Sequence, residues 1–364
     1  MSLAAACTYS VSPLRTVGGP DADARPDDDA GIIVECGDTS ENPQSCGACG
    51  HDCLGQPCSS GACKPAVLAA NQDEPRVLAA DERAVYWGGA GGDAGISACL
   101  DKACTRGPQK IADETSPVIA LASTKNYVFW ATRGSVGRYP KDVAVDDGGA
   151  GYVDNGAVQS AVALAADDTF FYFTFVSGDN RGGVARCPID GCDPDGGADS
   201  LAYDFDRPAG LGLGPAGFAF AAGLDSRSIF YCSPRCEDPP ANRARIVAER
   251  QAEPDTIALD DTRAYWTNAL AGPSDGVVRA ALGEPHALTT LASVATPGPL
   301  VVDKTFVYFV GRRDGSIHRV PKGGGLDLVL VRAQPTPPRA IAVDDKRLYF
   351  TNGGPKASVL WVGK

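Results

Sequence analysis

One stretch of this chain recurs, with changes, through most of its length. Residues Thr256-Ile-Ala-Leu-Asp-Asp-Thr-Arg-Ala-Tyr-Trp-Thr-Asn268 combine a short apolar segment, a polar turn and an aromatic segment. A repeat of about 43 residues that contributes two strands per copy is typical of a β-propeller. The further copies lie at Val77–Trp87, Ile119–Trp130, Val162–Phe173, Leu300–Phe309 and Ile341–Phe350, with a degraded copy at Leu211–Phe220.

The residue types in each copy predict where its strands lie within a blade. The first segment, such as Thr256–Leu259, is small and apolar, as strands that crowd around a propeller axis require. The second segment, such as Ala264–Trp266, carries aromatic rings, which fill the space between neighbouring sheets because alternate residues of a strand face opposite sides. An aromatic binding cage is the alternative, but repetition in nearly every copy favours core packing.

The two ends of the repeat region decide the number of blades. The chain closes with three strand-like segments, Ile341–Val343, Leu348–Thr351 and Ser358–Val362, and no fourth. Residues Pro65–Ala70 have the pattern of an outer strand but no partners before the first copy. Pairing them with the C-terminal segments hides two sheet edges. The sequence therefore predicts an all-β fold: a seven-bladed β-propeller over residues 64–364, with six full blades and one shared between the chain ends.

Twelve of the 13 cysteines fall into even sets. Residues 36–63 form a small module with almost nothing apolar to bury, so it needs cross-links to fold. Three disulfides in an exported protein are the favoured interpretation, and zinc bound by Cys46, Cys49, His51 and Cys53 is the alternative. The remaining close pairs predict bridges across hairpins between third and fourth strands. The cysteines expected in disulfides are Cys36, Cys46, Cys49, Cys53, Cys58, Cys63, Cys99, Cys104, Cys187, Cys192, Cys232 and Cys236.

The first 35 residues predict an anchor and a linker rather than a folded domain. Ser2-Leu-Ala-Ala-Ala-Cys7 resembles the end of a bacterial lipoprotein signal, in which the cysteine is acylated after cleavage, so Cys7 is the candidate lipidation site. An unpaired cysteine in a tail is the alternative. The run Asp21–Asp29 is acidic, which indicates an extended, disordered tether. We therefore expect an exported protein, either a cell-envelope lipoprotein or extracellular.

Two of the repeated segments resemble a known repeat. Tyr265-Trp-Thr-Asn268 and Tyr349-Phe-Thr-Asn352, each preceded by an Ile-Ala-Leu/Val-Asp-Asp segment, resemble YWTD repeats of lipoprotein-receptor propellers and NHL repeats. The fourth position is Asn where the receptor repeats have Asp. A cysteine-rich module followed by a propeller is also similar to exported bacterial proteins of a myxobacterial type. The resemblance implies the fold and the compartment, and it is nearly silent on activity.

Candidate sites must lie where the repeats differ. The loops that enter the inner strands ring one mouth of the channel and offer a concave place for a polar ligand, with ordinary surface charge as the alternative. A glycine turn with three carboxylates could bind Ca²⁺, with a solvated turn as the alternative. The mouth residues are Glu74, Arg76, Asp206, Arg207, Glu253, Asp255 and Arg339, and the calcium candidates are Asp193, Asp195 and Asp199.

The sequence contains little that indicates a catalytic site. The chain has three histidines, His51, His286 and His318, and their positions predict no histidine constellation within one blade. The net charge of −12 and the lack of a basic stripe disfavour nucleic acid or an anionic membrane as a partner, so we expect no nucleic acid to bind. We expect no cofactor beyond calcium, and membrane contact only through a lipid on Cys7.

The sequence therefore predicts a monomeric, surface-anchored binding module for a protein, a polar small molecule or a glycan. A structural component of the cell envelope is the first alternative. A lyase or hydrolase with carboxylates and arginines at the channel mouth is the second.

Overall fold

The structure is a computed structural model of the 364-residue chain. It describes residues 36–90, 95–143, 149–154, 158, 160–223, 227–233, 236, 244–269, 276–282, 287–354 and 356–364. Every regular element in these ranges is a β-strand. None of the described residues forms a helix long and apolar enough to cross a membrane.

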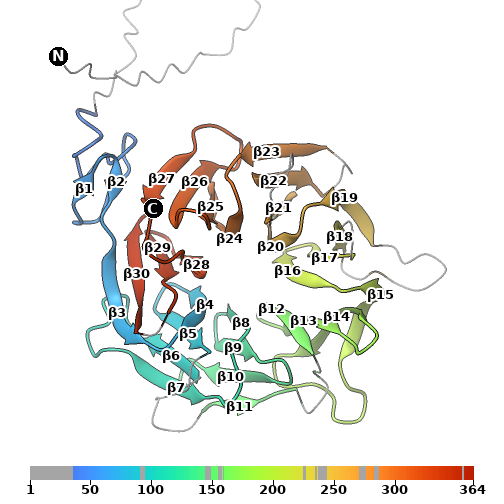
Figure 1. The fold of residues 1–364 in the computed structure, drawn as a ribbon. Helices are drawn as coiled ribbons and strands as arrows, with labels where there is room; N and C mark the ends of the chain where they lie inside the picture. The colour runs from blue at the N-terminus through green and yellow to red at the C-terminus, as the bar shows by residue number, and fades with distance from the viewer. Residues whose placement is uncertain are drawn as a thin grey trace, which may run out of the picture.

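Seven four-stranded antiparallel sheets form a closed ring around a central axis, which confirms the seven-bladed β-propeller (Figure 1). The first blades run from the inner strand outward in chain order. Blade 1 is β4 (Pro75–Ala80), β5 (Val85–Gly89), β6 (Gly95–Cys99) and β7 (Gln109–Asp113); blade 2 is β8 (Ala120–Ser123), β9 (Tyr127–Ala131), β10 (Val136–Pro140) and β11 (Gly151–Tyr152); blade 3 is β12 (Ala161–Ala166), β13 (Phe170–Val176), β14 (Arg181–Pro188) and β15 (Asp199–Asp206).

The next three blades follow the same plan. Blade 4 is β16 (Ala209–Gly214), β17 (Gly217–Ala222), β18 (Arg227–Cys232) and β19 (Arg245–Gln251); blade 5 is β20 (Pro254–Leu259), β21 (Arg263–Asn268), β22 (Gly276–Ala281) and β23 (Leu288–Ala292); blade 6 is β24 (Pro297–Val302), β25 (Phe306–Gly311), β26 (Ser316–Pro321) and β27 (Leu328–Val331).

Blade 7 joins the two ends of the repeat region. It consists of β28 (Ala340–Val343), β29 (Arg347–Thr351) and β30 (Ala357–Gly363), with β3 (Ala66–Gln72) as the outer strand. In the register, Ala66 lies opposite Trp361 and Val67 opposite Leu360. The predicted sharing of one blade between the chain ends is therefore confirmed.

The repeated Asp and Tyr stabilise the inner hairpin of a blade. One carboxylate oxygen of Asp260 accepts the N–H groups of Thr262 and Arg263 at 3.0 and 2.9 Å, and the other accepts the hydroxyl of Tyr265 at 2.7 Å. The same Asp–Tyr hydrogen bond joins Asp167 to Tyr172, Asp303 to Tyr308 and Asp344 to Tyr349. The pair thus builds a turn, and its recurrence follows from the repeat.

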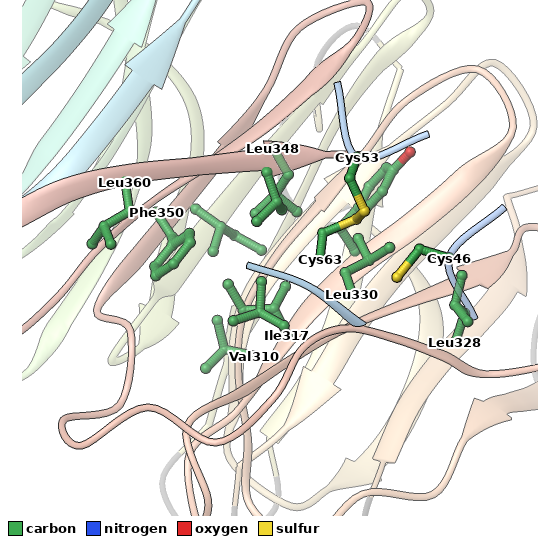
Figure 2. Packing of buried hydrophobic residues seen from close by; sticks show 14 of the residues in the cluster. Cys46, Cys53, Cys63, Val310, Ile317, Leu328, Leu330, Leu348, Phe350 and Leu360 are labelled. Carbon is green, nitrogen blue, oxygen red and sulfur yellow. A yellow bond between two sulfur atoms is a disulfide. The ribbon is translucent and has the colours of Figure 1, made fainter. Parts of the chain in front are cut away.

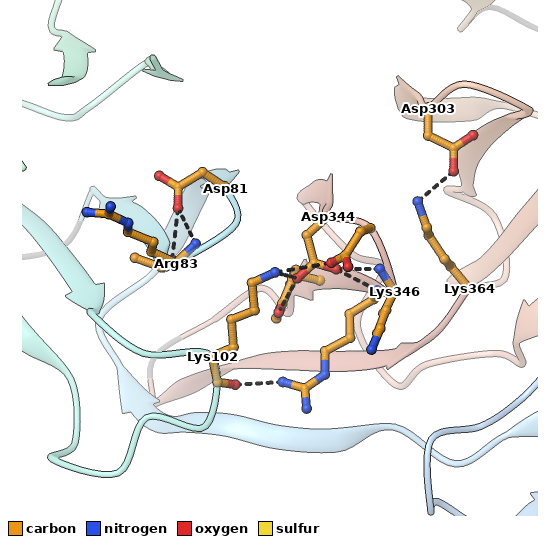
Figure 3. A network of polar contacts seen from close by, with 11 residues as sticks. Asp81, Arg83, Lys102, Asp303, Asp344, Lys346 and Lys364 are labelled. Carbon is orange, nitrogen blue, oxygen red and sulfur yellow. Dashed lines mark hydrogen bonds and ion pairs between the residues drawn. The ribbon is translucent and has the colours of Figure 1, made fainter. Parts of the chain in front are cut away.

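A lysine from the next blade completes this cluster at four blade interfaces among the described residues. Lys102 Nζ lies 2.8 Å from Asp344, and Lys364 Nζ lies 2.6 Å from Asp303, as Figure 3 shows. Lys141 pairs with Asp81 and Lys322 with Asp260 in the same way. Each lysine follows the third strand of one blade, and its ammonium group pairs with the aspartate in the inner hairpin of the preceding blade. The ion pairs therefore connect neighbouring sheets.

The cysteine module packs against the propeller instead of standing apart from it. Its disulfides are Cys36–Cys49, Cys46–Cys58 and Cys53–Cys63. The last two bridges lie in one hydrophobic cluster with Leu328, Leu348 and Leu360 of blades 6 and 7 (Figure 2). The apolar partners that residues 36–63 lack come from the propeller. The boundaries 1–35, 36–63 and 64–364 stay predictions.

His51 lies at the centre of this contact. Its ring is 2% exposed, with Nδ1 2.5 Å from the carbonyl oxygen of Cys46 and Nε2 3.2 Å from that of Gly363 at the end of β30. Burial lowers the pKa of His51 below its ordinary value. The histidine that suggested a zinc ligand therefore lies against two backbone carbonyls and 3.8 Å from the sulfur of Cys63, while the described cysteines are all paired. This arrangement favours the disulfide interpretation over zinc.

Candidate binding site at the channel mouth

The two faces of the ring are formed by different turns and loops. The inner hairpins, with their Asp–Tyr–Lys clusters, lie on one face, which we call the turn face. The loops that lead into the inner strands and those that join second to third strands lie on the opposite face, which we call the entry face. On the turn face, Asp81, Asp260, Asp303 and Asp344 pair with lysines of the neighbouring blades. We therefore look for a ligand site on the entry face.

A cavity of about 410 Å³ opens at the entry face within the channel. Its walls are the starts of the inner strands of blades 2 to 5, which contribute small and aliphatic side chains. Three charged residues, Arg227, Glu253 and Arg312, complete the lining. The other lining residues are Ile119, Ala120, Val162, Ala163, Leu164, Ala209, Gly210, Leu211, Pro254, Thr256, Ile257 and Ala269. The volume and the mixture of apolar wall and few charges suit a small ligand.

The predicted mouth residues do not all reach this cavity. Glu253 lines it, whereas Glu74, Arg76, Asp206, Arg207 and Arg339 do not. Arg76 pairs with Glu74 at 2.8 Å. Arg207 and Arg339 are exposed. Their backbone N–H groups donate to the carbonyl oxygens of Asn180 and Thr351, respectively. The side chain of Asp255 lies outside the described residues.

Several of these residues share a backbone conformation that explains their position in the sequence. Glu253 has a φ of 51°, in the left-handed region that non-glycine residues rarely adopt. The same conformation precedes the inner strand in blades 1, 3, 4 and 6, at Glu74, Ser160, Arg207 and Thr296. Because it recurs in blade after blade, we attribute it to the turn that each blade requires and not to a site.

Arg227 and Arg312 were missed because they come from another set of loops. Arg227 begins β18, and Arg312 follows β25. The connections between second and third strands end on the same face as the loops that enter the inner strands. Any charged residue that begins a third strand is therefore a candidate for the mouth, and this signal was present in the sequence.

The three carboxylates proposed for calcium do not converge. Asp193 accepts the N–H of Asp195 at 2.9 Å, and Asp199 pairs with Arg186 at 3.1 Å. Within the described ranges, the one group of three or more His, Cys, Asp or Glu ligand atoms found within 4.8 Å of one another is Cys46, Cys53 and Cys63, which are in disulfides. Calcium at this turn stays a prediction.

Blade 6 contains a histidine constellation, so the expectation that none forms within one blade was wrong. Oγ of Ser316 lies 2.7 Å from Nε2 of His318, and Nδ1 of that ring lies 2.9 Å from Asp327. These contacts match the order of a Ser-His-Asp triad. However, Ser316 is 3% exposed, its hydroxyl is also 2.6 Å from Asp314, and the imidazole stacks on Phe309 at 5.0 Å.

The hydroxyl of Ser316 is too buried for the carbonyl group of a substrate to reach it. We therefore interpret the three side chains as a polar tie between β26 and the start of β27. The sequence held a signal for this contact, since Ser316 and His318 are two residues apart on a strand and so share a face. Opposite the same aromatic position, blades 2, 3 and 5 carry Gly137, Ala185 and Val278, so the tie is particular to blade 6.

The disulfides indicate the compartment. Besides the three in the module, the structure pairs Cys99 with Cys104, Cys187 with Cys192, and Cys232 with Cys236. Six disulfides among the described residues indicate maturation in an oxidising environment outside the cytoplasm. Cys7 and His286 lie outside the described residues.

Comparison with known proteins supports the fold. No protein-family model matches the chain, and no curated protein matches it. Among solved structures, a streptogramin B lyase superposes with a TM-score of 0.60 at 15% identity, covering 82% of this chain and 96% of that one. The computationally designed Ika8 protein gives 0.56 at 16%, covering 82% and 98%. A nidogen/laminin complex gives 0.51 at 14%, covering 71% and 97%. At these identities the likeness shows the propeller fold and nothing more.

Proposed function

We propose that this protein is an exported binding module whose partner docks on the entry face of the propeller. Propellers serve mostly in binding, and one of the similar structures is a complex between two proteins, nidogen and laminin. Another is a lyase. The interpretation of the Ser316 cluster as a structural tie and the presence of a cavity at the mouth favour binding over catalysis.

One observation carries this proposal. The blades agree where they pack against each other and differ at the entry face, where the cavity holds charged side chains of both signs. Arg76, Arg207 and Arg339 are exposed at or just before the starts of the inner strands of blades 1, 4 and 7, outside the cavity lining. A concave, partly apolar surface with a charged rim is suited to a polar ligand or a protein loop.

A triple substitution at the rim tests the proposal. We expect the Arg76→Ala, Arg207→Ala, Arg339→Ala variant to lose at least tenfold in retention of the partner that the full chain captures from its native cell envelope, identified by mass spectrometry. The circular dichroism spectrum and melting temperature should stay those of the wild type, since exposed arginines contribute little to stability.

A matched triple substitution on the turn face is the control. Glu82, Arg83 and Asp261 are exposed in inner-hairpin turns, and their replacement by alanine should leave capture unchanged. The entry face would not be the docking surface if the rim variant captured as much partner as the wild type, or if only the control variant lost capture. A panel of hydrolase and lyase substrates that revealed turnover would favour the enzymatic alternative instead.

We also propose that Cys7 anchors the protein to a membrane through a lipid, with the acidic residues after it as a spacer. The lipobox-like Ala-Ala-Ala-Cys sequence supports this assignment. Replacement of Cys7 by serine in the native protein should move it from the membrane fraction to the soluble fraction. An unchanged distribution would leave extracellular release or a structural envelope role.

A further inference from the structure

We infer that the channel cavity holds a small organic carboxylate, whose anionic group binds Arg227. This inference rests on the proposed binding function and narrows the ligand of the same mouth. Arg227 is the arginine of the described residues whose Nε is buried without a hydrogen-bond partner.

Several arginines in this propeller have clear polar partners. The guanidinium groups of Arg138, Arg245, Arg279 and Arg347 each donate to a backbone carbonyl of the following blade, at Ile189, Leu282, Lys322 and Lys102. Arg186 pairs with Asp199 at 3.1 Å. Such contacts offset the cost of removing the charged group from water.

Among the described residues, Arg227 has no such partner. It is half-buried at the start of β18, its Nε is buried without a hydrogen-bond partner, and no carboxylate of the described residues pairs with it. A buried donor without a partner costs stability, so native structures leave one mainly where an ion, a water or a ligand satisfies it. Arg227 is only half-buried and lines the cavity, so the part of its side chain that faces the channel can meet a ligand there.

The guanidinium of Arg227 favours a ligand with an anionic group, and the walls of the cavity favour a ligand whose remaining part is apolar. The planar fork of an arginine binds a carboxylate through two parallel N–H···O hydrogen bonds. Around it the cavity presents Ile119, Leu164, Leu211 and Ile257. A volume of about 410 Å³ exceeds what a bare inorganic anion fills. The chemistry fits an organic acid with an apolar body.

Arg181 provides a matched control within the molecule. It begins β14 of blade 3 as Arg227 begins β18 of blade 4. However, its guanidinium pairs with Asp204 at 2.6 Å, and it does not line the cavity. The same substitution at the two positions therefore separates a general effect of removing an entry-face charge from a specific effect at the cavity.

Benzoate and benzamide are suitable probes, because they differ in charge and hardly in shape. Titration calorimetry of the full-length protein should show benzoate binding at least tenfold more tightly than benzamide. R227Q should reduce this preference at least tenfold, whereas R181Q should leave it unchanged. The melting temperature without ligand should be unchanged or higher in Arg227→Met, because the unpartnered donor is gone, and this readout separates a ligand-binding role from a structural one.

Three results would overturn the inference: equal affinity for benzoate and benzamide, equal benzoate affinity in R227Q and wild type, or a fall in the melting temperature of Arg227→Met. Inorganic phosphate that binds in an Arg227-dependent manner, without benzoate binding, would also overturn the assignment of a carboxylate. None of these results depends on capture of a partner by the rim arginines, so failure here and failure of the proposed function are distinguishable.

Discussion

At the scale of single residues, Asp260 shows how one carboxylate can look like a site and be part of the scaffold. It accepts two backbone N–H groups and the hydroxyl of Tyr265, and it pairs with Lys322 at 3.0 Å. Burial raises its pKa, but these hydrogen bonds and the lysine outweigh burial and lower the pKa to about 2. Burial, together with the hydrogen bond to the charged Asp260, raises the pKa of Tyr265.

Replacing Asp260 by asparagine should lower the free energy of unfolding by about 1–3 kcal/mol, because an amide cannot accept on both oxygens or pair with Lys322. Asp261, the exposed neighbour, is the control, and Asp261→Asn should change stability by less than about 0.5 kcal/mol. Urea unfolding monitored by tryptophan fluorescence measures both. Equal stability of the two variants would mean that the Asp–Tyr–Lys cluster is not a structural element.

The same carboxylates predict acid lability. Asp81, Asp303 and Asp344 also have pKa values below the ordinary value, since burial is outweighed by hydrogen bonds and by their lysine partners. A carboxyl group whose pKa is lower in the folded chain adds stability above its unfolded pKa and loses it as the pH falls through the folded value.

Stability should therefore be constant from about pH 6 to pH 5 and fall below about pH 4. For Asp260 the loss should extend down to about pH 2. Urea midpoints measured between pH 6 and pH 2.5 test this, and the decline should be shallower in Asp260→Asn. Parallel pH profiles of the variant and the wild type would contradict the assignment.

At the scale of elements, the docking of the cysteine module depends on the last strand. A Cβ atom on Gly363 of β30 would lie 2.0 Å from the carbonyl oxygen of Asp52, so the module and β30 approach too closely for any side chain there. This contact was not predictable from the sequence. The module's apolar partners, Leu328 and Leu360, follow it by hundreds of residues along the chain, and their patterns fit ordinary blade strands.

Gly363→Ala should weaken this contact and lower the free energy of unfolding by about 1–3 kcal/mol. It should also make residues 36–63 sensitive to proteases under conditions in which the wild type resists. Gly134→Ala is the control, because a Cβ at Gly134 meets nothing within 4 Å. Protease resistance of the module in Gly363→Ala equal to that in the control would show that the module does not rely on β30.

The sequence predicted the blades, but only part of the lining of the cavity. The small inner strands and aromatic second strands predicted the blades, because each blade requires the same packing. Glu253 was predicted at the mouth for the same geometric reason. Arg227 and the Ser316–His318–Asp327 tie were not predicted, because the features that the repeats share concern the inner and second strands, whereas these residues lie on or beside third strands.

At the scale of the whole molecule, closure of the ring rests on β3, the strand that comes before the first repeat. Ala69 is 3% exposed and packs in a cluster with Leu78, Tyr349 and Val359, whereas Val67 of the same strand is 58% exposed. The register with β30 shifts between Val67 and Ala69, and this irregularity interrupts the alternation of the strand, so the two residues differ in burial although they are two apart.

An aspartate at Ala69 should therefore destabilise the protein by at least about 3 kcal/mol, because it buries an unpaired charge at the joint of the ring. Val67→Asp should be neutral to within about 0.5 kcal/mol. Thermal unfolding followed by circular dichroism, with size-exclusion chromatography for open or associated rings, measures both. Equal melting temperatures for the two variants would contradict the pairing of β3 with β30.

The central claim is that a ligand binds where the blades differ, in the channel at the entry face. Hydrogen–deuterium exchange of the full chain, with and without saturating benzoate, tests it most directly. We predict slower exchange confined to the starts of the inner strands at Ile119–Ala120, Val162–Leu164 and Ala209–Leu211, and no such change in R227Q. Protection on the turn face or the outer strands instead, or no protection anywhere, would contradict the account.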